Sequence, residues 1–298
     1  MPKKGPELLF IVGPTASGKT EIALQEAERR EALILSCDSL CVYRGMDIGT
    51  AKPTEEEQGR IRHYGLDLAN PEEPYSVARY IAYRDALLEE HRTNGRPLIV
   101  VGGSGFYLKS FFAPVVDRIE IPEAAREAVR RIREAEGRDG LERAFKALHP
   151  VEETFPGLDL RNGRRLEKAL LRTLASGRSY RELRAAFETA PEPLGEWQKT
   201  VWLVSREKED LQERNRRRVA WMLEEGLVEE VRALQRRGFE RNPSACGAIG
   251  YREVLAFLKD PVSLEELAEA IYVHTNQLMR KQGSWFRHQI PVDRILGG

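Results

Sequence analysis

The residues best suited to chemistry lie near the start of the chain, in the run Gly13-Pro14-Thr15-Ala16-Ser17-Gly18-Lys19-Thr20. This run fits the Gly-x-x-x-x-Gly-Lys-Ser/Thr pattern of a phosphate-binding loop. Two glycines at these positions let the backbone curl so that successive N–H groups point at one centre. Lys19 adds a full positive charge, and the Thr20 hydroxyl is placed to meet a divalent cation. The pattern predicts a phosphate site but does not distinguish ATP, GTP or another diphosphate.

The elements around this loop are those that a phosphate loop requires. The apolar residues 8–12 predict a short buried strand before it, and residues 18–29 predict a helix after it. The helix N-terminus adds partial positive charge at the same place. A chance glycine turn before a helix is the alternative. The strand, both glycines, the lysine and the threonine together argue against it.

An aspartate follows the second predicted strand. Residues 32–36 form a short apolar run that leads directly into Cys37-Asp38-Ser39. Because ligands of parallel α/β sheets bind outside the carboxyl ends of the strands, we expect Asp38 near the phosphate loop. There it would act as a general base or help to hold a metal ion. The simpler alternative is an aspartate that caps a helix or a turn.

The third predicted strand, residues 97–101, ends in Gly102-Gly103-Ser104. An ATPase usually has an aspartate after such a strand to support Mg²⁺. The glycines instead permit close approach of a ligand or of backbone, and Ser104 offers a hydroxyl. This ending disfavours a motor or switch NTPase.

The rest of the chain predicts one α/β fold with an insertion. Its 298 residues suggest two domains, or one domain with an insertion. Strand-like runs disappear over 117–196 and return at 200–204. We therefore expect a P-loop NTPase-like parallel sheet flanked by helices, with an all-helical insertion domain: 1–116 and 198–298 form the core, and 117–197 the insertion. Helices are expected over 77–93, 207–224, 227–237, 250–258 and 264–288.

Composition limits the class of protein. Hydrophobic residues make up 41% of the chain and charged residues 32%, as in soluble globular proteins. No apolar run approaches the roughly 18 residues of a membrane span, and the N-terminus predicts no signal peptide. The three cysteines lack CxxC spacing, which favours a reduced cytoplasmic protein. The net charge is zero, yet basic residues crowd the stretch 161–172. Such a stretch fits a polyanion site or simply a solvated helix face.

Seven segments, taken in order, resemble one family. They are GPTASGKT, CDSLCVYRGMDIGTAKP, HYGLDLANPEEPYSV, PLIVVGGSGFYLK, GLVEEVRAL, AIGYRE and KQGSWFR. With the strand before the first of them, the resemblance extends from residue 8 to about 287. The chain resembles the bacterial type of the tRNA dimethylallyltransferase (tRNA isopentenyltransferase) family. The segment containing DSLCVYRGMDIGTAKP is the most specific, whereas the phosphate loop alone would not identify the family.

The resemblance implies a prenyl transfer. The dimethylallyl group of dimethylallyl diphosphate would move to N6 of the adenosine at position 37, just 3′ of the anticodon, in tRNAs that read codons beginning with U. The residues from Gly13 to Thr20 would hold the diphosphate, with Lys19 and a Mg²⁺ ion at Thr20 stabilising the leaving charge. Asp38 would orient the N6 amine and act as the base. Ser104 aligns with a family threonine near the reacting groups. Arg214 would clamp the diphosphate through its fork of N–H donors.

The resemblance also implies contacts with tRNA, largely through the insertion and the anticodon stem-loop. The residues so implied are Asp38, Ser39, Leu40, Cys41, Ser104, Arg126, Asn162, Gly163, Arg164, Arg165 and Leu166. Cys41 stands where the family usually has glutamine, Ser104 where it has threonine, Asn215 where it has an apolar residue, and Gly283-Ser284 where it has Leu-Thr. We expect a cytoplasmic monomer without a membrane partner.

Two other functions fit parts of the pattern. A small-molecule or nucleoside kinase would use the same loop for ATP and Asp38 as the base for a hydroxyl group. A non-catalytic RNA-binding protein would use a bound nucleotide as a switch, but it would need no carboxylate at the phosphate site. Turnover of ATP would favour the first alternative, and nucleotide-gated RNA binding without product would favour the second.

Overall fold

The computed structural model describes residues 6–117, 119–150 and 152–297. The chain divides into two compact units, of which the first combines Met1–Ala113 with Pro193–Gly298 and the second is Pro114–Glu192. The boundaries expected from the sequence, at 116/117 and 197/198, lie within a few residues of these. The two units are described separately below.

The first unit is built on a parallel sheet of six strands in the order β3-β2-β4-β1-β5-β6. The strands are β1 (Glu7–Val12), β2 (Leu33–Ser36), β3 (His63–Tyr64), β4 (Leu98–Gly102), β5 (Gln198–Val204) and β6 (Arg294–Leu296). The first strand lies between β4 and β5, with Phe10 opposite both Val100 and Val201. Its five residues from Leu8 to Val12 are buried, as expected of a central parallel strand covered on both faces.

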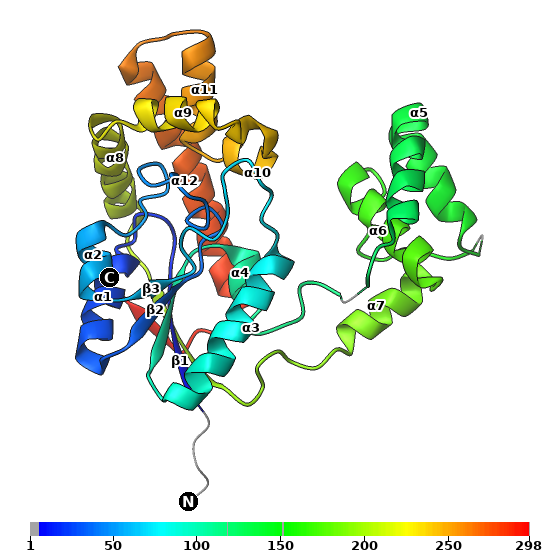
Figure 1. The fold of residues 1–298 in the computed structure, drawn as a ribbon, viewed down its shortest axis with the longest axis horizontal. Helices are drawn as coiled ribbons and strands as arrows, with labels where there is room; N and C mark the ends of the chain where they lie inside the picture. The colour runs from blue at the N-terminus through cyan, green and yellow to red at the C-terminus, as the bar shows by residue number, and fades with distance from the viewer. Residues whose placement is uncertain (1–5, 118, 151, 298) are drawn as a thin grey trace, which may run out of the picture. The chain divides into compact units, whose positions relative to one another are not determined.

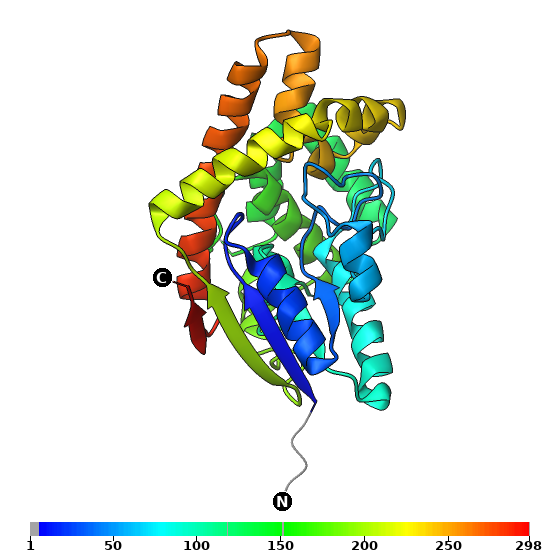
Figure 2. The ribbon, with the colours of Figure 1, turned by 90° about the vertical axis from the view of Figure 1, so that its left-hand side faces the viewer.

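Alternation along the strands divides the core into two layers. Leu9, Ile11 and Ile34 face α1 (Lys19–Arg30). The alternate residues of the same strands face α3 (Val77–Asn94), α4 (Gly105–Lys109) and α12 (Leu264–Gln289). Figures 1 and 2 show α1 on one side of the sheet, with β1 and β5 side by side behind it.

The remaining helices of this unit lie beyond the carboxyl ends of the strands, as Figure 1 shows for α8 to α11. They are α8 (Lys208–Glu224), α9 (Leu227–Arg236), α10 (Pro243–Cys246) and α11 (Tyr251–Lys259), with a 3₁₀ turn at Phe239–Arg241; α2 (Glu55–Arg60) precedes β3. The buried residues of α9 and α11 join the larger core layer. The strand ends that should carry chemistry are therefore covered by helices.

The second unit is entirely helical among its described residues. It contains α5 (Glu123–Ala147), α6 (Gly163–Ser176) and α7 (Tyr180–Glu188). A break in α5 at Gly137, with φ 61° and ψ −146°, makes two helical segments of it. Val129, Phe145 and Leu170 belong to a small core of its own. The predicted all-helical insertion is confirmed.

The predicted parallel sheet is also confirmed, and the strands predicted at 8–12, 32–36, 97–101 and 200–204 are found within two residues of these bounds. The short elements β3, β6, α2 and α4 were not predicted. A two-residue edge strand such as His63–Tyr64 carries too few residues to show any periodicity. Among the described residues, no helix is long and apolar enough to cross a membrane.

Candidate active site

The phosphate loop connects β1 to α1 with the expected curled backbone. Ala16 and Gly18 both have positive φ, 65° and 86°, and α1 begins directly afterwards at Lys19. Gly13 serves a different purpose, because a Cβ there would lie 2.6 Å from the Val204 carbonyl oxygen of the neighbouring strand. The loop can therefore follow β1 only because its first residue is glycine.

A cavity of about 780 Å³ adjoins this loop at the carboxyl ends of the strands. The predicted site residues on its wall are Thr15, Lys19, Thr20, Asp38, Ser39, Leu40, Cys41 and Ser104. The structure therefore brings together the ends of β1, β2 and β4, as the sequence predicted. The opposite wall comes from α8 and α12, with Val219, Ile271 and Leu278 among its apolar residues.

Asp38 follows the end of β2 by two residues and lies on the cavity wall. Its Oδ1 accepts a hydrogen bond from the Leu40 N–H at 2.8 Å, so the carboxylate closes a turn as the simpler alternative proposed. Within the described residues no hydrogen bond to Oδ2 is found. One oxygen therefore fixes the orientation of the group, and the other remains for a substrate.

Ser104 connects the ends of two strands. Its hydroxyl oxygen accepts a hydrogen bond from the Ser39 N–H at 2.9 Å, and the hydroxyl donates to Ser39 Oγ at 3.2 Å. Before it, Gly102 approaches Cys37 so closely that a Cβ would lie 2.2 Å from the Cys37 carbonyl oxygen. The glycine therefore accommodates backbone, and the close contact places Ser104 beside Asp38.

Lys19 carries an unusually low pKa. Burial of the ammonium group, with a smaller contribution from Arg218, lowers the pKa to about 8, and Asp38 and Cys41 oppose the shift. The ammonium group also donates to the Pro14 carbonyl oxygen at 3.3 Å. The lysine thus lies where an incoming anion would hold it in its charged form.

Arg218 is a cavity residue that the sequence did not single out for a role at the site. It lines the cavity from α8, and its Nη2 donates to the Thr50 carbonyl oxygen at 3.2 Å. Burial lowers the pKa of its guanidinium, while Asp38 and Cys41 act in the opposite direction. Arg218 therefore interacts electrostatically with Asp38 and Lys19. It was missed because it stands in the arginine-rich run 214–218, one helical turn after Arg214.

Arg214 lies beside the phosphate loop, although it does not line the cavity. A Cβ at Gly18 would be 3.8 Å from its Nη1. Its Nε donates to Asp210 Oδ1 at 3.1 Å, and Arg206 shares the same carboxylate while donating to the Ser17 carbonyl oxygen at 2.7 Å. Two arginines joined by one aspartate thus flank the loop. The clamp predicted for Arg214 stays a prediction.

Gln282 connects the C-terminal helix to the phosphate loop. Its Oε1 accepts a hydrogen bond from the Thr15 N–H at 2.9 Å, and its Nε2 donates to the Gly103 carbonyl oxygen at 3.2 Å. The side chain therefore bridges the ends of β1 and β4 from α12. The segment KQGSWFR carried this signal only through the family resemblance, because the partners are up to 267 positions apart.

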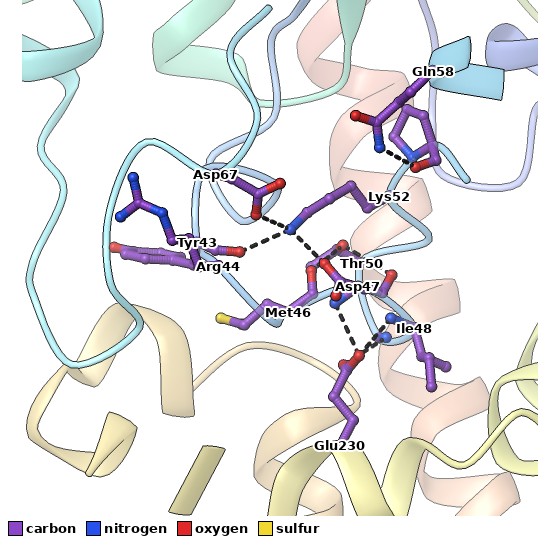
Figure 3. A network of polar contacts seen from close by, with 12 residues as sticks. Tyr43, Arg44, Met46, Asp47, Ile48, Thr50, Lys52, Gln58, Asp67 and Glu230 are labelled. Carbon is purple, nitrogen blue, oxygen red and sulfur yellow. Dashed lines mark hydrogen bonds and ion pairs between the residues drawn. The ribbon is translucent and has the colours of Figure 1, made fainter. Parts of the chain in front are cut away.

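The loop after β2 is held by ionic contacts that converge on the buried Lys52 side chain, whose two carboxylate partners stay exposed (Figure 3). Lys52 Nζ donates to the Tyr43 carbonyl oxygen at 2.9 Å, and it pairs with Asp47 at 2.5 Å and with Asp67 at 2.7 Å. Burial opposes the charge of Lys52, but the two carboxylates overcome it and raise the pKa. A buried ammonium is stable there because three oxygens surround it.

Cys41 and three aromatic residues near the cavity mostly have structural surroundings. Burial and the nearby Asp38 raise the pKa of the Cys41 thiol to about 12, which keeps it neutral. Tyr107 stacks on Tyr80 with ring centroids 4.0 Å apart, and Phe286 is fully buried. Trp285 is half-buried and lies close against Gly105.

The predicted RNA contacts of the second unit lie on or near α6. Arg164 and Arg165 are exposed, and Asn162 caps the helix by accepting a hydrogen bond from the Arg165 N–H at 3.2 Å. Gly163 is the first helical residue. The Leu166 side chain is fully buried in this unit's core, so it is a packing residue and not an exposed contact.

Arg126, on α5 of the same unit, is also exposed, and its guanidinium lies 3.9 Å from the Glu123 carboxylate. Its place near RNA stays a prediction.

The fold and the cavity together define a class of protein: an α/β enzyme of the phosphate-loop type with a carboxylate beside its phosphate site. The IPP transferase family matches residues 41–289 of the chain. A tRNA dimethylallyltransferase of Opitutus terrae is 44% identical over 97% of this chain and 92% of its own length.

Two solved structures share the fold. The tRNA isopentenylpyrophosphate transferase from Bacillus halodurans has 30% identity and a TM-score of 0.67, covering 98% of this chain and 89% of its own. A eukaryotic dimethylallyltransferase has a TM-score of 0.81 at 22% identity, covering 98% of this chain and 74% of its own. The chain therefore belongs to the tRNA dimethylallyltransferase (IPP transferase) family, and it is a transferase, as its sequence resemblance implied.

Proposed function

We propose that this enzyme transfers the dimethylallyl group of dimethylallyl diphosphate to N6 of the adenosine at position 37, in tRNAs that read codons beginning with U. The observation that carries the proposal is one cavity of about 780 Å³ that joins the phosphate loop to Asp38. A cavity of this size has room for a diphosphate and a nucleophile side by side. The membership of the family agrees with this reaction.

The diphosphate would bind at the phosphate loop. The N–H groups at the start of α1 supply hydrogen-bond donors, and Lys19 adds a charge. Within the loop, the Thr15 and Ser17 N–H groups are already bonded to Gln282 and to the Pro14 carbonyl oxygen. As the bond between C1 and the diphosphate oxygen breaks, negative charge grows on the leaving group, and these groups stabilise it. Arg218 on the wall and Arg214 beside the loop extend the positive field.

The donors at the loop fit a magnesium ion. Mg²⁺ usually takes one or two protein oxygens together with phosphate oxygens and water, so it needs no cage of carboxylates. Among the described residues no cluster of three or more His, Cys, Asp or Glu could hold a metal. Thr20 lines the cavity, and the fully buried Ser17 hydroxyl has no hydrogen-bond partner among the described residues. When bound, the ion would neutralise charge on the leaving diphosphate.

The adenine would meet the other end of the cavity. Its N6 attacks C1 of the dimethylallyl group, the N6–C1 bond forms, diphosphate leaves, and one N6 proton passes to Asp38. Ser104 and Ser39 lie beside this carboxylate and offer hydroxyl groups to the adenine ring. A base stacked in an anticodon loop must be extruded before it can enter such a site.

The helical unit would contact the anticodon stem-loop, chiefly its phosphates, through Arg164 and Arg165 with Asn162, Gly163 and Arg126 nearby. Both arginines are exposed, and neither forms an ion pair within the described residues. A tRNA substrate would place the enzyme in the cytoplasm. We propose that it acts as a monomer, because a single chain supplies every group named above.

The proposal is tested with an anticodon stem-loop in which purine riboside, which lacks the N6 amine, replaces the adenosine at position 37. Enzyme, Mg²⁺ and dimethylallyl diphosphate should modify the adenosine RNA and leave the substituted RNA unchanged. Nucleoside digestion and mass spectrometry identify the product. Modification of the substituted RNA would place the transfer at another atom or position, and would reject the proposed acceptor.

A further inference from the structure

A tight turn over residues 46–52 forms part of the cavity wall through Gly49, Thr50 and Ala51. The Thr50 hydroxyl donates to the Met46 carbonyl oxygen at 2.8 Å, and the Lys52 N–H donates to the Asp47 carbonyl oxygen at 3.0 Å. These bonds wind the segment so that its early N–H groups need partners outside it. A turn with unpaired N–H groups in succession is a ready site for an anion.

The anion is supplied by the protein itself. Glu230 of α9 accepts hydrogen bonds from Asp47 N–H at 2.9 Å and Ile48 N–H at 2.7 Å through Oε2, and from Gly49 N–H at 3.2 Å through Oε1 (Figure 3). The Tyr251 hydroxyl donates a fourth bond to Oε1 at 2.7 Å. Bonds to an ionised acceptor are the stronger kind, so this carboxylate holds the turn firmly.

The turn also packs directly against the first residue of α11, which prevents it from shifting in that direction. A Cβ at Gly49 would lie 2.5 Å from the Tyr251 ring, which means that backbone and ring are already in close contact. The Tyr251 side chain therefore packs its ring against the turn, and its hydroxyl fixes the orientation of the Glu230 carboxylate.

The far side of the turn holds a residue of the active site. The Thr50 carbonyl oxygen accepts the hydrogen bond from Arg218 Nη2 at 3.2 Å. Arg218 in turn interacts with Asp38 and Lys19 in the cavity. One short segment thus receives Glu230 on its N–H groups and presents a carbonyl group to Arg218.

We infer that Glu230 is a positioning residue for the transfer reaction: it fixes the turn 47–50 and thereby sets the Arg218 guanidinium against the reacting groups. This role rests on the proposed function, which assigns Arg218 to the charge that develops on the substrates. The segments GLVEEVRAL and AIGYRE, which had no role in the chemistry, acquire one here, because they contribute Glu230 and Tyr251.

The experiment compares Glu230→Gln with a matched control on the same helix. Glutamine keeps one acceptor oxygen but turns an NH₂ group toward N–H groups of the turn, so the turn should loosen. We expect kcat/KM for the stem-loop to fall about 10- to 100-fold, the usual effect of displacing a reacting group by about 1 Å. Glu229→Gln removes only an exposed pairing with Arg232 at 3.6 Å and should leave the kinetics unchanged.

A double-mutant cycle separates positioning from a general loss of stability. If Glu230 acts through Arg218, then Arg218→Ala with Glu230→Gln should be no slower than Arg218→Ala alone. If Glu230 only supports the fold, the two losses should multiply. Should Glu230→Gln fail to fold, Tyr251→Phe removes one of the four bonds and keeps the ring; it should lower kcat/KM about 3- to 10-fold and show the same non-additivity.

The outcomes are distinguishable. Transfer by the wild-type enzyme, together with unchanged activity in Glu230→Gln or with losses that multiply, would overturn the role of Glu230 and leave the proposed function intact. Failure of the wild-type enzyme to modify the RNA at all would reject the proposed function and this role with it.

Discussion

The Ser104 hydroxyl oxygen accepts a hydrogen bond from the Ser39 N–H at 2.9 Å, and this contact joins the carboxyl ends of β4 and β2 beside Asp38. The two serines are 65 positions apart in the chain. Their contact means that the carboxylate and the hydroxyl groups around it form one rigid group of acceptors and donors. The mechanism depends on that rigidity, since a base must meet its proton at hydrogen-bond distance.

Asp38→Asn should lower the rate of transfer by about 10²- to 10⁴-fold, the usual contribution of a general base. The amide oxygen can still accept the hydrogen bond from Leu40 N–H, so the turn is retained. Single-turnover rates at saturating dimethylallyl diphosphate measure the effect, and affinity for the stem-loop should stay within a few fold. Asp38→Ala should be as slow. Weakened RNA binding with an unchanged rate would rule out Asp38 as the base.

Diphosphate binding should weaken as the pH rises above about 8, because the Lys19 pKa lies at about 8 in the free enzyme. Below that pH the ammonium group is charged and attracts the diphosphate; above it the neutral amine does not, and binding must take up a proton. Affinity for dimethylallyl diphosphate, measured by calorimetry between pH 7 and 9.5, should fall accordingly.

Lys19→Arg is the control for this pH dependence, because a guanidinium stays charged throughout the range. Its affinity should vary much less with pH, whatever its absolute value. A wild-type affinity that is flat across the range would contradict the assignment of the charge to Lys19. Lys19→Ala should also raise the KM for dimethylallyl diphosphate, and unchanged kinetics with that substrate would reject its role.

Arg218→Ala should lower kcat/KM by about 10²- to 10³-fold, as for removal of one preorganised donor. This loss should exceed the loss in Arg214→Ala. Arg218 lies on the cavity wall, whereas Arg214 is paired with Asp210 beside the loop. Arg214→Ala should act mainly on the KM for dimethylallyl diphosphate. Steady-state kinetics with each substrate varied decide the order, with the exposed Arg217→Ala as the control. A larger loss of kcat in Arg214→Ala would reverse the assignment.

Arg164→Ala and Arg165→Ala should raise the KM for tRNA and reduce its dependence on salt. Each lost phosphate contact lowers the slope of log affinity against log salt by about one unit. Arg133→Ala is the matched control, because that arginine is already paired with Glu167 at 3.1 Å. If the KM for dimethylallyl diphosphate moved instead, the arginines would belong to the other substrate.

The sheet and its phosphate loop could be predicted because their signals are local. A buried strand such as 8–12 shows its apolar run, and the loop after it has fixed residue types. Asp38 and Ser104 could be placed for a similar reason, since the carboxyl ends of parallel strands meet at one edge of the sheet. These residues needed only the order of strands along the chain.

Arg218, Gln282 and Glu230 could not be placed in the same way. Arg218 stands among several arginines of one helix, and only the packing of α8 decides which one faces the cavity. The three backbone N–H groups that bind Glu230 lie more than 180 positions away, on a loop without regular structure. Contacts of this kind depend on tertiary structure and leave no local pattern in the sequence.

The central claim is that the loop holds a prenyl diphosphate and not a nucleoside triphosphate. The most direct measurement mixes the enzyme with unmodified anticodon stem-loop RNA and Mg²⁺, adding dimethylallyl diphosphate to one sample and ATP to another, and weighs the RNA by mass spectrometry. The account predicts the gain of one dimethylallyl group, on the adenosine next to the anticodon, in the first sample only. Unchanged RNA there, with ATP consumed in the second sample, would contradict it and favour a kinase.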